Sequence, residues 1–227
     1  MQTNNNIAMK ISRLIWFLPI SLFIVSCSQN EICSSLKTAE DIINDNPDST
    51  LSILREIDYE ALKDNHLKAL YGLLYTSANI KKQKVPDNDS LIDYSIQFFE
   101  NINDSYHLAD SDYYKGMMCY AKKQLEASAH YLKKAESLSI EFGYSWITNK
   151  IYERLIYLNY ITDNKALTLE YSKKFLESSF ELKDRALISR AFVMVASSYS
   201  AVNLSDSAYF YLKSGLRYID DVNSILS

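Results

Sequence analysis

The residues able to act as nucleophiles, bases or metal ligands do not form a recognised catalytic pattern. His66, His107 and His130 have no second ligand at i+3 or i+4 in an H-E-x-x-H frame. The sequence contains no G-x-S-x-G motif, no glycine-rich phosphate loop and no C-x2-C pair. The neighbouring acids Asp110 and Asp112 are typical of a polar helix surface. We therefore expect no catalytic residue, no metal site and no cofactor, and a protein that is not an enzyme.

One cysteine, Cys27, lies in a pattern that predicts covalent chemistry. A short basic region with Lys10 and Arg13 precedes an apolar run over residues 14–25, which is typical of a secretory signal. The run ends I-V-S-C, which resembles the lipobox of bacterial lipoproteins. The resemblance implies that residues 1–26 are cleaved and that the sulfur of Cys27 receives a diacylglycerol. Each buried CH2 group of such a chain contributes about 0.8 kcal/mol to membrane attachment.

The residue after Cys27 bears on the destination of the protein. In the lipoprotein family an Asp at this position favours retention at the inner membrane, and this sequence has Ser28. We therefore expect a lipid-anchored protein of the cell envelope, at the outer membrane. Residues 27–33 are expected to form a polar tether to the following domain, residues 34–227.

The composition indicates an all-α domain. Only four Gly and three Pro occur among 227 residues, and alternation of apolar and polar residues typical of strands is hard to find. Eighteen Tyr suit helix faces that are partly core and partly groove. The net charge is -4, and Lys and Arg do not form the clusters that bind the phosphates of nucleic acids. Nucleic acid is therefore not an expected partner.

Apolar spacing and turn residues predict a chain of helices. The boundary at Asn46-Pro47 is followed by Asp48 or Ser49 as an expected cap, residues 84–89 form a loop, and Gly143 ends a helix. The residues expected to face inward are Ala39, Ile42, Ile43, Thr50, Leu54, Ile57, Ser95, Phe99 and Ile102. The predicted helical stretches are 37–46, a short helix from about 50, 59–82, 90–102, two helices within 113–137 that continue toward Gly143, 146–160, 166–180, 184–201 and 205–219.

Small residues recur where paired helices must touch. Gly116 lies on one helix, and Ser128, Leu132 and Ala135 follow on the next at i, i+4 and i+7. A single helical hairpin cannot bury its apolar face, whereas stacked hairpins can. The first helices of the pairs align at Gly72, Gly116, Leu155 and Ala196. The second helices align by sets of three residues, and these sets start at unequal intervals along the sequence. The sets are Thr50/Leu54/Ile57, Ser95/Phe99/Ile102, Ser128/Leu132/Ala135, Leu167/Tyr171/Lys174 and Ala208/Leu212/Gly215.

The spacing G-x2-C-x8-S-x3-L-x2-A resembles the tetratricopeptide repeat, with Cys119 and Ser128 as departures from its usual Tyr and Ala. The segments PDSTLSIL, DSLIDYSI, YYKG and HYLKKAE resemble tetratricopeptide lipoproteins and sensor ectodomains of Gram-negative anaerobes. The resemblance spans about residues 34–221. It implies a right-handed α-solenoid of four to five antiparallel helix pairs.

The same resemblance assigns five inner positions on each first helix to a concave groove. Counted from Ala196, they are Arg190, Val193, Ser197, Ser200 and Ala201. Rings supply contact area and amides can bond a peptide backbone, so the groove is expected to bind a protein or peptide. The residues expected to contact the partner are Asp110, Tyr113, Tyr120, Asn149, Tyr152, Asn159, Tyr160 and Arg190.

The expected function is a lipid-anchored scaffold that presents this groove to a protein or peptide partner. One alternative is the ectodomain of a transmembrane sensor, which an exposed apolar last repeat would favour, since solenoid ends normally carry a polar cap. The other is a glycan-binding outer-membrane lipoprotein, which an exposed Trp146 beside Tyr144 would favour.

Overall fold

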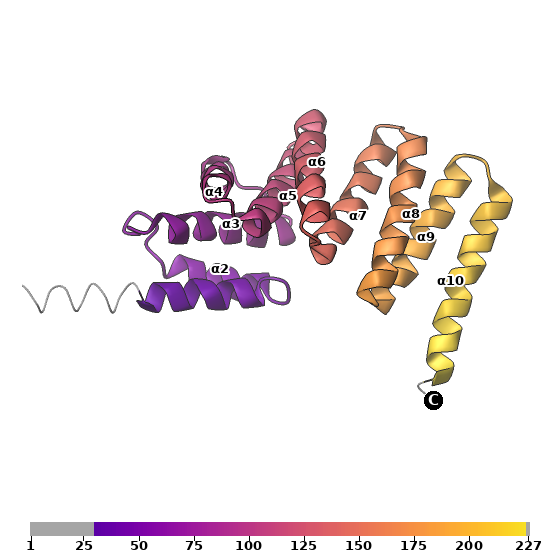
Figure 1. The fold of residues 1–227 in the computed structure, drawn as a ribbon, viewed down its shortest axis with the longest axis horizontal. Coiled ribbons are helices and arrows are strands. Elements are labelled where there is room, and N and C mark those ends of the chain that lie inside the picture. The colour runs from indigo at the N-terminus through magenta and orange to yellow at the C-terminus, as the bar shows by residue number, and fades with distance from the viewer. Residues whose placement is uncertain (1–29, 226–227) are drawn as a thin grey trace, which may run out of the picture.

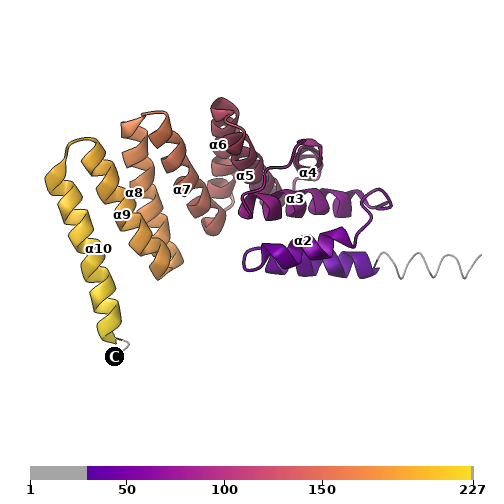
Figure 2. The same cartoon turned by 180° about the vertical axis from the view of Figure 1, so that it is seen from behind.

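The computed structural model describes residues 30–225, and the described part is a stack of antiparallel helix pairs (Figure 1). The signal segment, Cys27 and the first tether residues lie outside the described residues. The N-terminal helices run across Figure 1 and those from α6 onward run nearly vertically, so the stack turns along its length; Figure 2 shows the same turn from behind. After a first helix over residues 30–42, the helices are α2 Pro47–Arg55, α3 Asn65–Lys81, α4 Ser90–Asn101, α5 Ser105–Ala121, α6 Leu125–Glu141, α7 Ser145–Ile161, α8 Lys165–Leu182, α9 Arg185–Ala201 and α10 Ser205–Ile225.

The turns from α3 onward recur at even intervals along the sequence. One residue in each of these turns has a left-handed backbone, with φ between 56° and 72°. In most of them the following residue donates its N–H to the carbonyl five positions earlier, as Gln124 does to Cys119 at 2.9 Å and Asn164 does to Asn159 at 2.8 Å. These bonds are those of a Schellman motif and end the helices at equivalent places. The evenly spaced left-handed residues are Gln83, Asn103, Lys123, Gly143, Asp163, Lys183 and Asn203.

The helix pair therefore repeats at every second turn, with a constant period, whereas alignment by small residues alone gives unequal spacings. The fourth aligned set is wrong by one residue. Thr168, one period after Ser128, is 5% exposed, whereas Leu167 is 37% exposed. On α7 the equivalent of Gly116 is likewise Ile156, and not Leu155. The residue types at 155 and 156, and at 167 and 168, are compatible with either alignment. The even spacing of the turns identifies the correct one.

Helix starts also differ from the sequence-based boundaries. The first helix begins at residue 30, so residues 30–33 of the expected tether are helical. Asn46 caps α2 by accepting the Ser49 N–H, because Pro47 occupies the first helical position, where its missing N–H costs nothing. Asp64 caps α3 at Asn65, so the helix expected from residue 59 starts later than predicted.

The expected interior is largely confirmed. Close approach occurs at both interior glycines: a Cβ on Gly116 would lie 2.9 Å from Cγ of Leu132, and one on Gly72 would lie 2.5 Å from the Leu91 carbonyl oxygen. Ile102 is the exception among the positions expected to face inward: it ends α4 and is 46% exposed. The buried residues form two clusters, one over residues 36–78 and one from α3 to α9, and α3 contributes to both.

Asp112 and His107 are ionisable side chains within this framework whose pKa is shifted. Asp112 on α5 is fully buried, and its carboxylate lies 3.7 Å from Nζ of Lys134 on α6. Burial raises the pKa of Asp112 to about 6. His107 lies between Glu40 of the first helix, at 2.9 Å, and Asp104, the cap of α5, at 2.6 Å. Burial opposes protonation of His107, but these two hydrogen bonds raise its pKa to about 9.

Candidate partner-binding surface

A cleft opens between α7 and α9, the first helices of two neighbouring pairs. It encloses about 450 Å³ and has mainly apolar walls. Tyr160 is 67% exposed and Val193 is 53% exposed, so large apolar groups at the cleft are open to solvent. The lining residues are Ile156, Tyr157, Tyr160, Thr168, Arg190, Val193, Met194, Ser197, Ser198 and Ala201.

A charged pair lies beside this cleft. Nη1 of Arg190 on α9 lies 2.8 Å from Oε1 of Glu153 on α7. The Arg190 side chain remains half exposed, so its guanidinium group can still meet a partner. This ion pair joins the two helices that form the walls of the cleft. A change in the width of the cleft, or a ligand bound in it, therefore affects the pair.

Two of the eight predicted groove residues, Tyr160 and Arg190, lie in this cleft. Val193, Ser197 and Ala201 also lie there, as counting from Ala196 predicts. The agreement follows from the correct register of α9, where Ala196 occupies the position equivalent to Gly116.

Asn149 and Tyr152 were assigned to the groove and lie elsewhere. Nδ2 of Asn149 donates to the hydroxyls of Ser178 at 2.7 Å and Ser179 at 3.1 Å, so this amide is buried inside its own helix pair. The Tyr152 ring lies 6.0 Å from the ring of Tyr171 on α8. Both corrections follow from the one-residue slip on α7, since counting from Leu155 selects the wrong face.

Counting from Ile156 instead selects Glu153, Tyr157 and Tyr160, which all lie at the cleft or in its charged pair. Glu153 and Tyr157 were missed from the sequence for this reason. The signal that could have found them is the even recurrence of the polar turns at Lys123, Asp163 and Asn203.

Asp110 and Tyr113 belong to the contact between α5 and α7. Oδ1 of Asp110 lies 3.0 Å from Nζ of Lys150, which lies 4.7 Å from the centre of the Tyr113 ring and 5.2 Å from that of Tyr114. Tyr113 is 5% exposed. The ring that was expected to contact a partner therefore packs between neighbouring pairs, covered by a lysine.

The last two predicted residues are half-buried. Nδ2 of Asn159 donates to the Leu155 carbonyl of its own helix at 2.7 Å. Tyr120 packs against the larger apolar cluster. The predicted set is thus divided among a cleft, a helix contact and the interior of a pair, and does not form one continuous strip.

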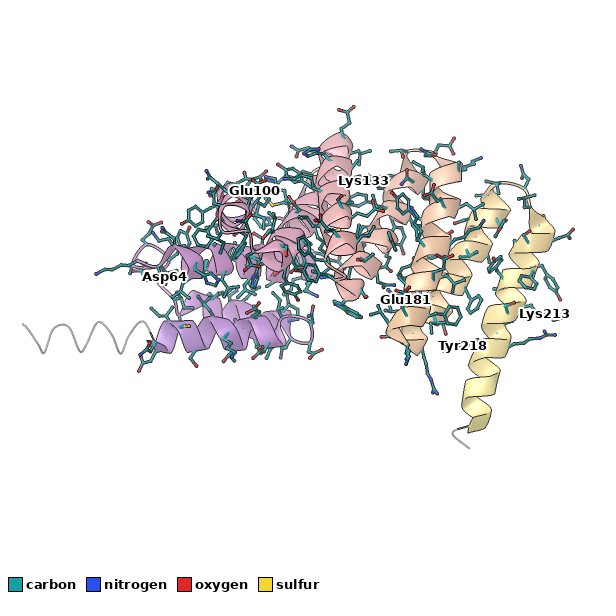
Figure 3. The ribbon with its side chains drawn as sticks, viewed as in Figure 1. Asp64, Glu100, Lys133, Glu181, Lys213 and Tyr218 are labelled. Atoms are coloured by element: carbon teal, nitrogen blue, oxygen red, sulfur yellow. The ribbon has the colours of Figure 1, made fainter. Side chains whose placement is uncertain are left out.

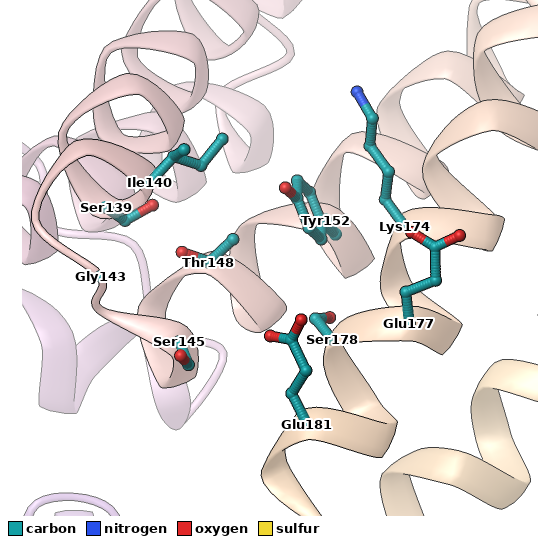
Figure 4. Close-up of a pocket in the computed structure, with 10 residues that line it drawn as sticks. All are labelled: Ser139, Ile140, Gly143, Ser145, Thr148, Tyr152, Lys174, Glu177, Ser178 and Glu181. Atoms are coloured by element: carbon teal, nitrogen blue, oxygen red, sulfur yellow. The ribbon is translucent and has the colours of Figure 1, made fainter.

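A second, more polar hollow of about 260 Å³ lies between α6, α7 and α8 (Figure 4). Its walls carry the hydroxyls of Ser139, Ser145 and Thr148, with Glu177 and Glu181 from α8. An aromatic group lies close in sequence to the wall that carries Ser145: the Tyr144 ring stacks on Phe142 at 6.0 Å and meets Tyr106 at 5.3 Å, and Trp146 is 45% exposed.

Over residues 30–225, no three His, Cys, Asp or Glu residues lie together in a group that could hold a metal ion. In the same range no helix is both long and apolar enough to cross a membrane. Cys119 is buried and Cys33 is exposed, and neither is in a disulfide.

Comparison with known proteins supports the fold. No protein family model matches the sequence, and no curated protein matches it. The structure is similar to the apo form of the quorum sensor NprR from B. thuringiensis, with a TM-score of 0.60 and 18% sequence identity. The similarity covers 84% of this chain and 54% of that chain, so this chain spans about half the length of that structure. The predicted all-α solenoid of antiparallel helix pairs is confirmed.

Proposed function

We propose that the protein is a scaffold that binds a protein or peptide partner in the cleft between α7 and α9. The observation that carries the proposal is the exposure of Tyr160 and Val193 on facing walls of a largely apolar cleft. Solvent-exposed aromatic and aliphatic groups in a concave site are typical of anchors for a partner side chain. NprR, which shares the fold, is described as a quorum sensor.

The cleft also indicates the character of the bound segment. The apolar walls suit one large apolar side chain, and Arg190 suits a carboxylate or backbone carbonyl beside it. Arg190 is half exposed although Glu153 is largely covered, so Arg190 can exchange its acceptor. We therefore propose a peptide segment that combines one apolar anchor with an acidic or carbonyl group.

The cleft is tested by a photo-crosslinking amino acid at position 160 of the full chain in intact cells. We expect a discrete adduct, identified by mass spectrometry, because Tyr160 exposes its ring to the bound segment. Val193→Asp should reduce the adduct at least about tenfold by placing a charge on the opposite wall. The control is the same crosslinker at position 142, since Phe142 is 51% exposed and lies away from the cleft. Equal adducts at both positions, or no effect of Val193→Asp, would contradict the assignment.

We also propose that Cys27 carries the lipid anchor and that the scaffold resides in the cell envelope, at the outer membrane. The support is the I-V-S-C sequence after an apolar run. Metabolic labelling with an alkyne-bearing fatty acid should mark the wild-type chain and Cys33→Ala, and Cys27→Ala should lose the label and leave the membrane fraction. A labelled Cys27→Ala chain would show that the attachment is elsewhere.

The structure contains features that favour each of the two alternative functions. A glycan-binding role is favoured by the exposed Trp146 near the aromatic group of Tyr144 and by the hydroxyl-lined hollow of Figure 4. Quenching of Trp146 fluorescence by neutral oligosaccharides, in a Trp16→Phe background, would detect it. The sensor-ectodomain alternative is favoured by exposed apolar residues on α10.

A further inference from the structure

Helix α10 carries three large apolar side chains on one solvent-facing side. Tyr209 is 66% exposed, Leu212 46% and Leu216 57%. The opposite side of α10 packs inward, with Gly215 against Phe192 and the Tyr218 ring 5.9 Å from the Phe180 ring. Figure 3 shows Tyr218 on the side of α10 toward α8 and α9 and Lys213 on the far side. We call Tyr209, Leu212 and Leu216 the α10 stripe.

Two of these three positions are buried in the two preceding helix pairs. Leu132 on α6 and Ser172 on α8 occupy the positions equivalent to Leu212 and are 1% and 0% exposed. Glu136 and Leu176 occupy the positions equivalent to Leu216 and are 4% and 8% exposed. Leu132 packs on Gly116 of α5 within its own pair, and α6 and α8 also contact the next helix, α7 or α9. Among the described residues no helix follows α10, and its stripe is open to solvent.

The spacing of the stripe indicates that its occupant is a helix. The stripe residues at 209, 212 and 216 are separated by three and four positions, which is the alternation that forms a seam between two helices. Leu212 lies near the middle of this seam. Two copies of α10 that cross near Leu212 in antiparallel directions would bring Tyr209 of each copy to Leu216 of the other.

The charges on α10 favour the antiparallel direction. Asp206 lies about as far before Leu212 as Arg217 lies after it. An antiparallel crossing therefore places Asp206 of one copy near Arg217 of the other, whereas a parallel one aligns like charges. The stripe offers a small contact compared with the area that stable interfaces bury, which indicates a dimer of moderate affinity.

We propose that the α10 stripe is a self-association surface, and that its occupant is α10 of a second copy of this chain in a two-fold, antiparallel arrangement. The stripe lies on α10, outside the residues that line the cleft between α7 and α9, so this cleft remains open in both copies. The inference does not depend on the proposed function.

The test uses the full chain in intact cells with Cys33→Ser, to remove the exposed thiol among the described residues. Leu212→Cys lies close to the two-fold axis and should give a disulfide-linked dimer on mild oxidation. The matched control is Ile140→Cys, because Ile140 is an exposed apolar residue (55%) at the end of α6. It should give little dimer, as random collisions do.

A charge exchange makes the test specific to the antiparallel pairing. In the Leu212→Cys background, Asp206→Arg should lower the dimer yield at least fivefold, and adding Arg217→Asp should restore it. Helical circular dichroism checks that each variant folds. Absence of a dimer, equal yields at positions 212 and 140, or a yield insensitive to the charge exchange would each overturn the proposal.

Discussion

At the scale of single residues, Asp112 departs most from ordinary packing. Its carboxylate is fully buried, neither oxygen has a hydrogen-bond partner among the described residues, and the hydroxyls of Ser111 and Ser128 are also unpaired there. Burial of an ionised carboxylate without hydrogen bonds is costly and favours the protonated form. The Lys134 ammonium group 3.7 Å away offsets part of this cost.

This environment predicts how stability changes with pH. The pKa of Asp112 is raised from 3.8 to about 6, so its contribution is most favourable below pH 3.8 and is lost as the pH rises through 6. Asp112→Asn should remove this loss and raise the free energy of unfolding at pH 7 by about 1–2 kcal/mol. Urea denaturation at pH 4.5 and pH 7 measures the difference. The exposed change Glu126→Gln is the control, and an unaltered pH dependence in Asp112→Asn would refute this account.

The groove residues show how far sequence reasoning reaches at this scale. Residue type identified Tyr160 and Arg190 as surface groups, and the correct register of α9 placed Arg190 at the cleft. Asn149 and Tyr152 fit the same chemical description, but the direction of a side chain on a helix changes by about 100° for each residue of slip. Composition carries no information about that direction, so a one-residue error on α7 assigned to the groove the buried Asn149 and Tyr152, which lines the polar hollow.

At the scale of elements, the turns set the geometry of the array. Six of the seven left-handed turn positions are not glycine, although a left-handed backbone costs most other residues about 1 kcal/mol or more. Asn and Asp tolerate this conformation, but Lys123, Lys183 and Gln83 have no such advantage. The recurring hydrogen bonds of the turns outweigh this cost and keep the turns evenly spaced.

Lys123→Gly should therefore stabilise the protein. We expect the free energy of unfolding to rise by about 0.5–1 kcal/mol, because glycine adopts φ 62° without steric cost. Ser137→Gly at an exposed helical position of α6 is the control and should destabilise by a similar amount. Thermal denaturation of the two variants compares them directly; a loss of stability in Lys123→Gly would contradict the assigned role of the turn.

The helix pairs themselves were predictable to different degrees. From α5 to α9 the breaks at Gly143, Thr162-Asp163-Asn164 and Asn203 stand out in the sequence, and the helices end there. Near the N-terminus the signals conflict. Residues 59–62 carry an apolar pattern compatible with a helix, yet Asp64 offers a stronger cap, and α3 begins after it.

At the scale of the whole molecule, His107 joins the N-terminal helix to the body of the array. Its ring bridges Glu40 and Asp104, groups far apart in the sequence, and stacks on Phe99 with ring centres 4.9 Å apart. Because Glu40 lies on the first helix and Asp104 caps α5, the contact couples the two apolar clusters.

The protonated form of His107 is the one that the folded protein stabilises. Its pKa is raised from 6.5 to about 9, so the stabilisation is complete below pH 6.5 and is lost as the pH rises through 9. His107→Gln should lower the free energy of unfolding at pH 6 by about 1–2 kcal/mol after allowance for partial solvent screening, and should flatten its decline between pH 6.5 and 9. Denaturation curves across this range, with the exposed His130→Gln as control, provide the measurement. An unchanged decline in His107→Gln would assign it to other groups.

The even spacing of the turns has a consequence for the history of the chain. A block of one helix pair, cut between two equivalent turns, begins and ends with the same backbone geometry, so its removal or duplication leaves the flanking helices in matching positions. The array can thus be lengthened or shortened by whole helix pairs without a change in the turns that join them. Natural selection can then adjust reach and curvature separately from the side chains that recognise a ligand.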